Sequence, residues 1–381
     1  MANSCLLSHL LHSSHILPPF VSFPSPSISS SGRYHRPRRR VAVQSSLAVE
    51  PQPVYSWVRT FAPATIANLG PGFDFLGCAV EGLGDHVSIQ VDASVRPGEI
   101  CISEISGAQG LSKNPQWNCA GIAAAAVMEM LGVRSVGLSL SLEKGLPLGS
   151  GMGSSAASAA AAAVAVNEMF GGKLGEQDLV MAGMESEAKV SGRHADNIAP
   201  AIMGSFVLIG GYDPLKLRRL QYPKERVQPV FVLVSPTDFE APTKKMRAAL
   251  AEQVEREVHV WNSSQAAGLV AALLLGDLPA LGEAMSSDKV VEPRRGPLIP
   301  GFVEVKDAAI SAGAFGCTIS GAGPTIVALT DDEDSGNEIG RQMVEAFWEG
   351  GGLRARATIS RLDRVGARLV GCVPVTASSL A

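Results

Sequence analysis

The segment Pro147–Val166, PLGSGMGSSAASAAAAAVAV, constrains the fold more than any other part of the chain. Glycine stands at every second position from Gly149 to Gly153, directly before a run rich in alanine. Alanine has the highest helix propensity and a small side chain, so the run predicts a closely packed helix from Ser154 to about Phe170. One capping residue would suffice to start such a helix. The glycines therefore indicate that something else approaches this backbone.

The glycine segment predicts an anion site. Glycine has no Cβ, so its backbone can adopt positive φ and approach a ligand closely. The N–H groups of the loop and of the first helical turn would point to one spot, where the helix dipole adds positive charge. The anion that this arrangement favours is the phosphate chain of a nucleotide. A flexible loop before a buried helix is the alternative.

Other nucleotide-binding patterns do not fit this segment. The P-loop ends in Gly-Lys-Ser/Thr, and no lysine ends this loop. A dinucleotide fingerprint needs G-x-G-x-x-G, whereas the spacing here is G-x-G-x-G. The HRD and DFG landmarks of protein kinases are absent from the sequence. The segment therefore indicates a different class of nucleotide site.

Composition excludes several classes of protein. The 381 residues are 46% hydrophobic and 18% charged, which is typical of a globular protein long enough for two domains. The net charge of −4 gives a nucleic-acid partner no electrostatic support. No apolar run approaches the length of about 18–20 residues that a membrane helix needs. The six cysteines form no CxxC pair, which indicates a reducing compartment without structural disulfides or a zinc site.

The first part of the chain differs from the rest. Residues 1–49 contain no Asp or Glu, while Ser, Pro and Arg crowd the segment PPFVSFPSPSISSSGRYHRPRRR. This composition is typical of an organelle transit peptide, which we expect at residues 1–46 and disordered. A disordered basic tail is the alternative.

Apolar patterning predicts an α+β protein with antiparallel or mixed sheets, because strands and helices occur in both halves without strict βαβ alternation. After a polar stretch the pattern restarts with the buried strand PVFVLVSP, which places a domain boundary near residue 228. We expect an N-terminal, ATP-binding domain at 47–228, a C-terminal domain at 229–371 and a tail at 372–381.

In the second half we expect a helix at 243–258 with a core stripe, helices at 263–277, 301–313 and 336–351, and an acidic solvated loop at 331–338. The stripe consists of residues four apart in sequence: Met246, Leu250, Val254 and Val258.

Three segments occur in an order typical of one family: PATIANLGPGFDFLG at 63–77, PLGSGMGSS at 147–155 and SGAGPTIVAL at 320–329. They resemble the three motifs of the GHMP kinases, a family of small-molecule kinases, and the resemblance covers about residues 55–371. It implies a two-domain fold with an N-terminal ribosomal-protein-like βαβ domain and a C-terminal ferredoxin-like domain. ATP would lie between them.

Three further segments, Glu185–Gly204, Ala241–Arg247 and Val291–Phe302, resemble the homoserine kinase branch of this family. With the leader, they are similar to the plant plastid type. The resemblance implies Mg²⁺-dependent transfer of the ATP γ-phosphoryl group to the side-chain hydroxyl of L-homoserine, for threonine biosynthesis in the chloroplast stroma. A homodimer is compatible with it; nucleic acid and membrane are not expected partners. A GHMP kinase for another alcohol and a catalytically silent ligand sensor are the alternatives.

The resemblance implies an ATP site on the glycine loop and a metal site on Ser155 and Glu187. An exposed ion pair is the alternative for Glu187, and Glu185 would point elsewhere on the same helix. Asn118 is either a helix cap or a contact near the nucleotide base. The expected ATP-binding residues are Asn118, Pro147, Leu148, Gly149, Ser150, Gly151, Met152, Gly153, Ser154 and Ser155.

A zwitterionic amino acid needs an anion for its ammonium and a cationic fork for its carboxylate. Asp74 suits the first, and Arg247 and Arg295 suit the second, because a guanidinium binds a carboxylate bidentately. The E-P-x-R spacing favours Arg295 over Arg294. Solvent-facing ion pairs are the alternative for both arginines. The remaining residues expected at the substrate are Asn68, His194, Asn197, Thr243 and Gly321.

For catalysis, the resemblance implies positioning and charge stabilisation by Asn197 and Arg247 rather than a conventional base. Such chemistry is adequate for a loose phosphoryl-transfer transition state. Asp196 as a base remains open. Ser205 departs from the family pattern, since glycine is frequent at that position.

Overall fold

Two β-sheets form the frame of the described chain, which comprises residues 50–190 and 192–376 in the computed structural model. The predicted transit peptide at residues 1–46 lies outside the described residues, as does the end of the predicted tail. The two mixed or antiparallel sheets with their helices confirm the predicted α+β class.

The first sheet has seven strands in the order β11-β1-β2-β4-β3, with β5 paired to β2 and β6 paired to β5. Only β3 and β4 run parallel, and η1 (Pro115–Trp117) and α1 (Cys119–Leu131) connect them. The strands are β1 (Tyr55–Ala67), β2 (Leu76–Val91), β3 (Ile100–Ser106), β4 (Leu138–Glu143), β5 (Phe206–Tyr212), β6 (Leu215–Leu220) and β11 (Arg368–Pro374).

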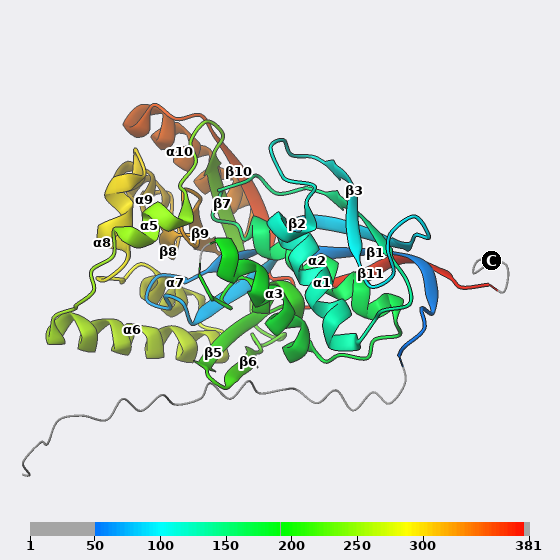
Figure 1. The fold of residues 1–381 in the computed structure, drawn as a ribbon. Coiled ribbons are helices and arrows are strands. Elements are labelled where there is room, and N and C mark those ends of the chain that lie inside the picture. Colours follow the sequence, from blue (N-terminus) through cyan, green and yellow to red (C-terminus); the bar gives the residue numbers. More distant parts are fainter. Residues whose placement is uncertain (1–49, 191, 377–381) are drawn as a thin grey trace, which may run out of the picture. The chain divides into compact units, whose positions relative to one another are not determined.

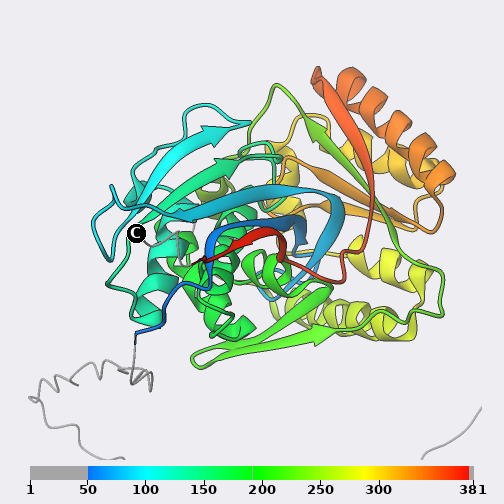
Figure 2. The ribbon, with the colours of Figure 1, turned by 90° about the vertical axis from the view of Figure 1, so that its right-hand side faces the viewer.

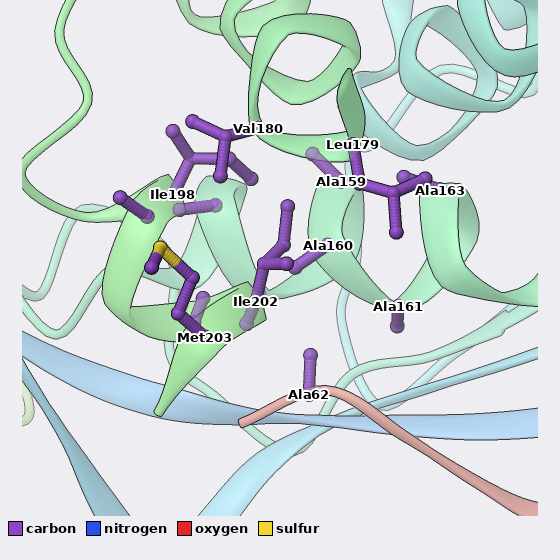
Figure 3. Packing of buried hydrophobic residues seen from close by; sticks show 14 of the residues in the cluster. Ala62, Ala159, Ala160, Ala161, Ala163, Leu179, Val180, Ile198, Ile202 and Met203 are labelled. Atoms are coloured by element: carbon purple, nitrogen blue, oxygen red, sulfur yellow. The ribbon is translucent and has the colours of Figure 1, made fainter. Parts of the chain in front are cut away.

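The helix predicted from the alanine run is confirmed as α2 (Ser154–Met169). Its alanines are buried because it packs against α1, β1 and β2 and against α3 (Glu176–Val190) and α4 (Ile198–Met203). Figure 3 shows the small alanine side chains of α2 packed among side chains of β1, α3 and α4. The labelled side chains are Ala62, Ala159, Ala160, Ala161, Ala163, Leu179, Val180, Ile198, Ile202 and Met203.

The second sheet has four antiparallel strands in the order β10-β7-β9-β8. Numbered along the chain, this order is 4-1-3-2, as in a ferredoxin-like domain. Its strands are β7 (Val230–Pro236), β8 (Gly316–Ile319), β9 (Ile326–Thr330) and β10 (Ala355–Arg361). Helix α10 (Glu333–Gly351) packs on β7, β9 and β10, and α9 (Phe302–Ser311) packs beside α10 (Figure 1).

The chain crosses between the sheets twice. The predicted boundary near residue 228 falls between β6 and β7. Strand β6 belongs to the first sheet and β7 to the second, so the chain first crosses here. After β10 the chain returns, and β11 pairs with β1 (Figure 2). The last strand therefore lies in the first sheet, although it begins inside the segment 229–371.

The predicted helix at 243–258 is wrong. The structure has a short helix, α5 (Thr243–Ala248), and then α6 (Arg256–Leu275), which also includes most of the helix expected at 263–277. Met246 is buried, but Val254 is 43% exposed. A four-residue recurrence describes a helix face only where another element is present to cover it, and no such surface faces Val254.

Three further short elements complete the described chain: α7 (Leu278–Met285), α8 (Glu292–Arg295) and η2 (Gly296–Leu298). The segment 331–338 is not a loop as expected, because Asp332 caps α10 and Glu333 and Asp334 lie in its first turn. Acidic side chains are favourable there, since they face the positive end of the helix dipole.

Among the helices of the described ranges, α6 alone reaches the length and mean hydropathy of a membrane-crossing segment, and 17% of that window is buried. It lies beside α7 at the edge of the protein (Figure 1). The expected absence of an apolar run of this length did not anticipate α6, because polar residues such as Asn262 and Ser263 interrupt its apolar sequence.

Candidate functional site

A cavity of about 490 Å³ is lined by four loops and two short helices. The loops are the glycine loop, the β1–β2 loop, the β8–β9 loop and the loop that precedes α4, and the helices are α5 and α8. Eighteen of the residues predicted for the site line it. They are Asn68, Asp74, Asn118, Leu148, Gly149, Ser150, Gly151, Gly153, Ser154, Ser155, Glu187, His194, Asp196, Asn197, Thr243, Arg247, Arg295 and Gly321.

Two predicted residues do not line the cavity. Met152 is 5% exposed and belongs to the hydrophobic core. Pro147 only braces the loop, since its carbonyl oxygen accepts a hydrogen bond of 3.0 Å from the Ser150 hydroxyl. Alternate residues of a turn point to opposite sides, and the sequence motif does not say which side faces the ligand.

The three loop glycines have positive φ, at 61°, 82° and 67° for Gly149, Gly151 and Gly153. A Cβ on Gly151 would lie 2.5 Å from the carbonyl oxygen of Ser320, so this glycine is needed for close packing against the β8–β9 loop. The missing Cβ thus serves contact between the two glycine loops as well as the approach of a ligand. Sequence reasoning considered only the second purpose.

Beneath the loop lies an ion pair that sequence reasoning missed. The Lys144 ammonium donates to Asp85, to the Ser154 carbonyl oxygen at 2.8 Å and to the Ser158 hydroxyl at 2.9 Å. Both side chains are almost completely buried. Burial lowers the pKa of Lys144, and the charge of Asp85 opposes that effect. The pair ties β2 and the end of β4 to the first turn of α2.

Ser155 and Glu187 lie together, as the resemblance implied. The Ser155 hydroxyl donates to Glu187 Oε1 at 2.8 Å, and Glu187 is 6% exposed. Glu185 instead faces solvent near Arg193. Within the described residues no group of three or more His, Cys, Asp or Glu side chains could hold a metal ion. A hydroxyl and one carboxylate suit Mg²⁺ nevertheless, because this ion takes its other ligands from phosphate and water.

The expected charges of the amino-acid pocket are paired with each other. The Arg247 guanidinium donates to both oxygens of the Asp74 carboxylate, at 2.9 and 2.7 Å. His194 Nδ1 lies 3.7 Å from Asp74 Oδ1. Asp74 has a φ of 64°, and its N–H donates to Asn68 Oδ1 at 3.1 Å. The β1–β2 loop thus holds the Asp74 carboxylate toward α5.

Arg295 is 2% exposed, whereas Arg294 is exposed. The Arg295 guanidinium donates to the carbonyl oxygens of Gly321 at 2.8 Å and Met246 at 3.3 Å. It lies over the Phe73 ring, as does Arg247, at 5.0 and 5.1 Å from the ring centroid. Burial and the neighbouring Arg247 lower the pKa of Arg295 to about 10, so it remains charged near neutral pH.

Asp196 and Asn197 directly precede α4, with Asn197 at the N-cap position of that helix. Burial, followed by the nearby carboxylates of Asp74 and Glu187, raises the pKa of Asp196 to about 7. Asn197 Oδ1 accepts a hydrogen bond of 2.8 Å from the Thr65 hydroxyl on β1. Ser205, where glycine was expected, has a φ of 62°, and its hydroxyl is satisfied by the Leu220 carbonyl oxygen at 2.8 Å.

The structure adds residues to the cavity that no motif indicated, among them Trp117, Lys144 and Ser158, and also Phe73, which lies in the first motif but was not expected to have a role. The only sequence signal for Lys144 was a charged residue directly after an apolar strand. Asn118 caps α1, since its Oδ1 accepts from the Ala120 N–H at 3.0 Å, and it also lines the cavity. The two readings of Asn118 are therefore compatible.

Residues 118–205 match the family model for the N-terminal domain of GHMP kinases, and residues 269–350 match the model for their C-terminal domain. The chain is 64% identical to a homoserine kinase of Arabidopsis thaliana over 374 residues, which cover 98% of this chain and 100% of the relative. It is 38% identical to a homoserine kinase of Chloroherpeton thalassium over 82% of this chain and 99% of that one.

Solved structures of GHMP kinases share the fold of this chain. The crystal structure of homoserine kinase from Cytophaga hutchinsonii is similar with a TM-score of 0.78 and 37% identity, covering 84% of this chain and 99% of that one. A mevalonate kinase of L. major shares the fold with a TM-score of 0.61 at 16% identity, over 83% of this chain and 99% of that one. The two-domain fold expected from the motifs is thereby confirmed.

Proposed function

The chain belongs to the GHMP kinase family, and on this premise we propose that it acts as an ATP-dependent homoserine kinase. It would transfer the γ-phosphoryl group of ATP to the side-chain hydroxyl of L-homoserine and release O-phospho-L-homoserine and ADP. The relatives that cover nearly the whole chain support this reaction, since they are homoserine kinases.

One observation carries the substrate assignment: a carboxylate and two guanidinium groups converge in the cavity that the glycine loop also lines. A zwitterionic amino acid presents one positive and one negative group, so it can exchange with the Asp74–Arg247 pair charge for charge. The ammonium would take the place of Arg247 beside Asp74. The carboxylate would bind Arg247 and Arg295, for which the bidentate guanidinium geometry is suited.

The nucleotide phosphates would lie on the glycine loop and on the N-terminus of α2, where backbone N–H groups and the helix dipole favour anions. Ser155 and Glu187 would hold Mg²⁺, which supplies positive charge to the phosphoryl oxygens when bound. Lys144 keeps the first turn of α2 in place from below, because its ammonium binds the Ser154 carbonyl oxygen.

Asn197, Asp196 and Arg247 would surround the reacting hydroxyl. Positioning and charge stabilisation account for most of phosphoryl transfer, which needs little help from a base. Asp196, with a pKa of about 7, can hold or accept a proton near neutral pH, so its role as a base remains an alternative to pure positioning.

We also propose that the enzyme serves threonine biosynthesis in the chloroplast stroma after removal of residues 1–46. The plant relative and the acid-free leader support this location. The homodimer and the domain limits at 47–228 and 229–371 stay predictions.

The reaction is tested by coupled ADP release from Mg·ATP with L-homoserine, D-homoserine, mevalonate or L-serine, using the full chain. We expect turnover mainly with L-homoserine. A matched preparation of Glu187→Ala, which lacks the proposed metal ligand, controls for contaminating kinases. Turnover confined to mevalonate, or ATP binding without turnover of any of the four, would overturn the proposal.

A further inference from the structure

We propose that Thr65 is a positioning residue that orients the side-chain amide of Asn197, so that its NH₂ group faces the reacting oxygen atoms. The inference rests on the proposed function of the cavity. Thr65 lies on β1, is 1% exposed and does not line the cavity. It acts through one contact, the 2.8 Å hydrogen bond from its hydroxyl to Asn197 Oδ1.

The hydrogen bond decides between the two orientations of the amide. Within the described residues, Asn197 Oδ1 is the hydrogen-bond partner of the Thr65 hydroxyl. If the amide were rotated by half a turn, the hydroxyl would accept from Nδ2, and its own hydrogen would have no acceptor in a buried position. Leaving a buried donor unsatisfied is costly, so the hydroxyl selects the orientation in which it donates.

The surrounding packing holds this pair in place. Thr65 is β-branched and therefore has few χ1 rotamers. Its N–H donates to the Met152 carbonyl oxygen at 3.1 Å, which ties β1 to the glycine loop. A Cβ on Gly153 would clash with the Thr65 hydroxyl and would lie 3.0 Å from Asn197 Oδ1. The pair is thus packed against the last glycine before α2, which leaves no room for a larger residue at position 153.

This orientation restricts what Asn197 can do. Because the hydrogen bond holds Oδ1 toward Thr65 on β1, the two N–H donors of Nδ2 lie on the other side of the amide, which lines the cavity. A donor can stabilise negative charge on the hydroxyl or phosphoryl oxygens in the transition state. It cannot accept the proton of the substrate hydroxyl, for which a phosphoryl oxygen and Asp196 are the candidate acceptors.

The first test compares Thr65→Val with Thr65→Ser. Valine has the shape of threonine without the hydroxyl, so we expect kcat to fall about 10-fold or more while KM for ATP and L-homoserine changes little. Serine restores the hydroxyl and should recover most of the lost kcat. Thr60→Val is the matched control, because Thr60 lies on the same strand with a buried hydroxyl that donates to the Ala161 carbonyl oxygen, away from the cavity.

The second test asks whether Thr65 acts through Asn197. In an Asn197→Ala background the Thr65→Val change should have almost no further effect on kcat, because the two side chains act as one unit. The inference would be overturned if the fold-losses of kcat from Thr65→Val and Asn197→Ala multiplied in the double variant. It would also be overturned if Thr65→Val and Thr60→Val lost kcat equally. If Thr65→Val does not fold, Thr65→Ala serves for both comparisons.

The wild-type protein separates this inference from the proposed function. Absence of turnover with L-homoserine would refute the proposed function. Normal wild-type turnover with an unchanged kcat in Thr65→Val would refute only the role of Thr65.

Discussion

Burial opposes the charge of Arg295, and its hydrogen bonds to carbonyl oxygens, its contact with Phe73 and the nearby carboxylates of Asp74, Asp196 and Asp288 compensate in part. Two of its N–H groups are used by the protein, and the others are available for a substrate carboxylate. A guanidinium can make all of these contacts in one plane, whereas an ammonium cannot.

Arg295→Lys should therefore raise KM for L-homoserine by about 10-fold or more and leave KM for ATP almost unchanged. Initial-rate kinetics with each substrate varied in turn measures both. Arg294→Lys is the matched control, because Arg294 lies next to Arg295 on α8 but is exposed and should tolerate the change. An equal loss of ATP affinity in Arg295→Lys would contradict the assignment.

Asp196 predicts a pH dependence of stability. Its pKa is about 7 in the folded protein, against an ordinary value of 3.8. As pH rises, the unfolded chain loses this proton before the folded protein does. The contribution of Asp196 to the free energy of unfolding is therefore complete below pH 3.8 and is lost as the pH rises toward 7. From about pH 5 to pH 8 the free energy of unfolding of the wild type should fall by about 3 kcal/mol relative to Asp196→Asn.

Urea unfolding of both proteins without nucleotide and metal measures this difference. A difference between the two proteins that does not vary with pH would show that the carboxyl has an ordinary pKa. Asp92→Asn is a suitable control, because hydrogen bonds from Ser94 lower the pKa of that carboxyl, so it stays ionised over this pH range.

At the scale of elements, the glycine loop joins α2, β1 and the β8–β9 loop, and Gly153 lies at the junction. It caps α2 in the left-handed conformation, with a φ of 67°. A side chain at this position must both adopt that conformation and displace Thr65 or Asn197. The loop can therefore move only together with its neighbours.

We expect Gly153→Ala to destabilise the protein by more than the roughly 1–2 kcal/mol that a left-handed conformation costs an alanine. It should also raise KM for ATP. Gly132→Ala is the matched control: Gly132 ends α1 with a φ of 70°, and no atom lies within 4 Å of the added Cβ. Urea unfolding with equal losses in the two variants would contradict the packing described here.

Elements with a strong local signal were predicted well from the sequence. Helix α2 and strand β7 follow from alanine content and an apolar run, and α9 and α10 lie where helices were expected at 301–313 and 336–351. The division of residues 243–258 into α5 and α6 did not follow, because local periodicity cannot show whether a facing surface exists. Strand β6 was read as a polar stretch, since only its pairing with β5 makes it a strand.

At the scale of the whole molecule, the candidate site depends on contacts between residues far apart in the chain. The motifs indicated which segments meet, and most of their residues line one cavity. The motifs did not indicate that Asp74 pairs with Arg247, or that Lys144 and Asp85 support the loop from below. These pairs arise from tertiary packing, for which a single sequence carries no local pattern.

The central claim also concerns the whole molecule: the cavity recognises a zwitterion with residues of the β1–β2 loop and of α5, which are far apart in the sequence. Asp74 should be responsible for selecting substrates with an ammonium group. 4-Hydroxybutyrate has the hydroxyl and carboxylate of L-homoserine and lacks the ammonium, so it isolates this contribution.

The most direct measurement is kcat/KM for L-homoserine and for 4-hydroxybutyrate with the wild-type protein and with Asp74→Asn. We predict that the wild type prefers L-homoserine by a factor on the order of 10³, and that the preference falls to about 10 or less in the variant. An unchanged preference in Asp74→Asn would contradict the account, because the ammonium would then be recognised elsewhere.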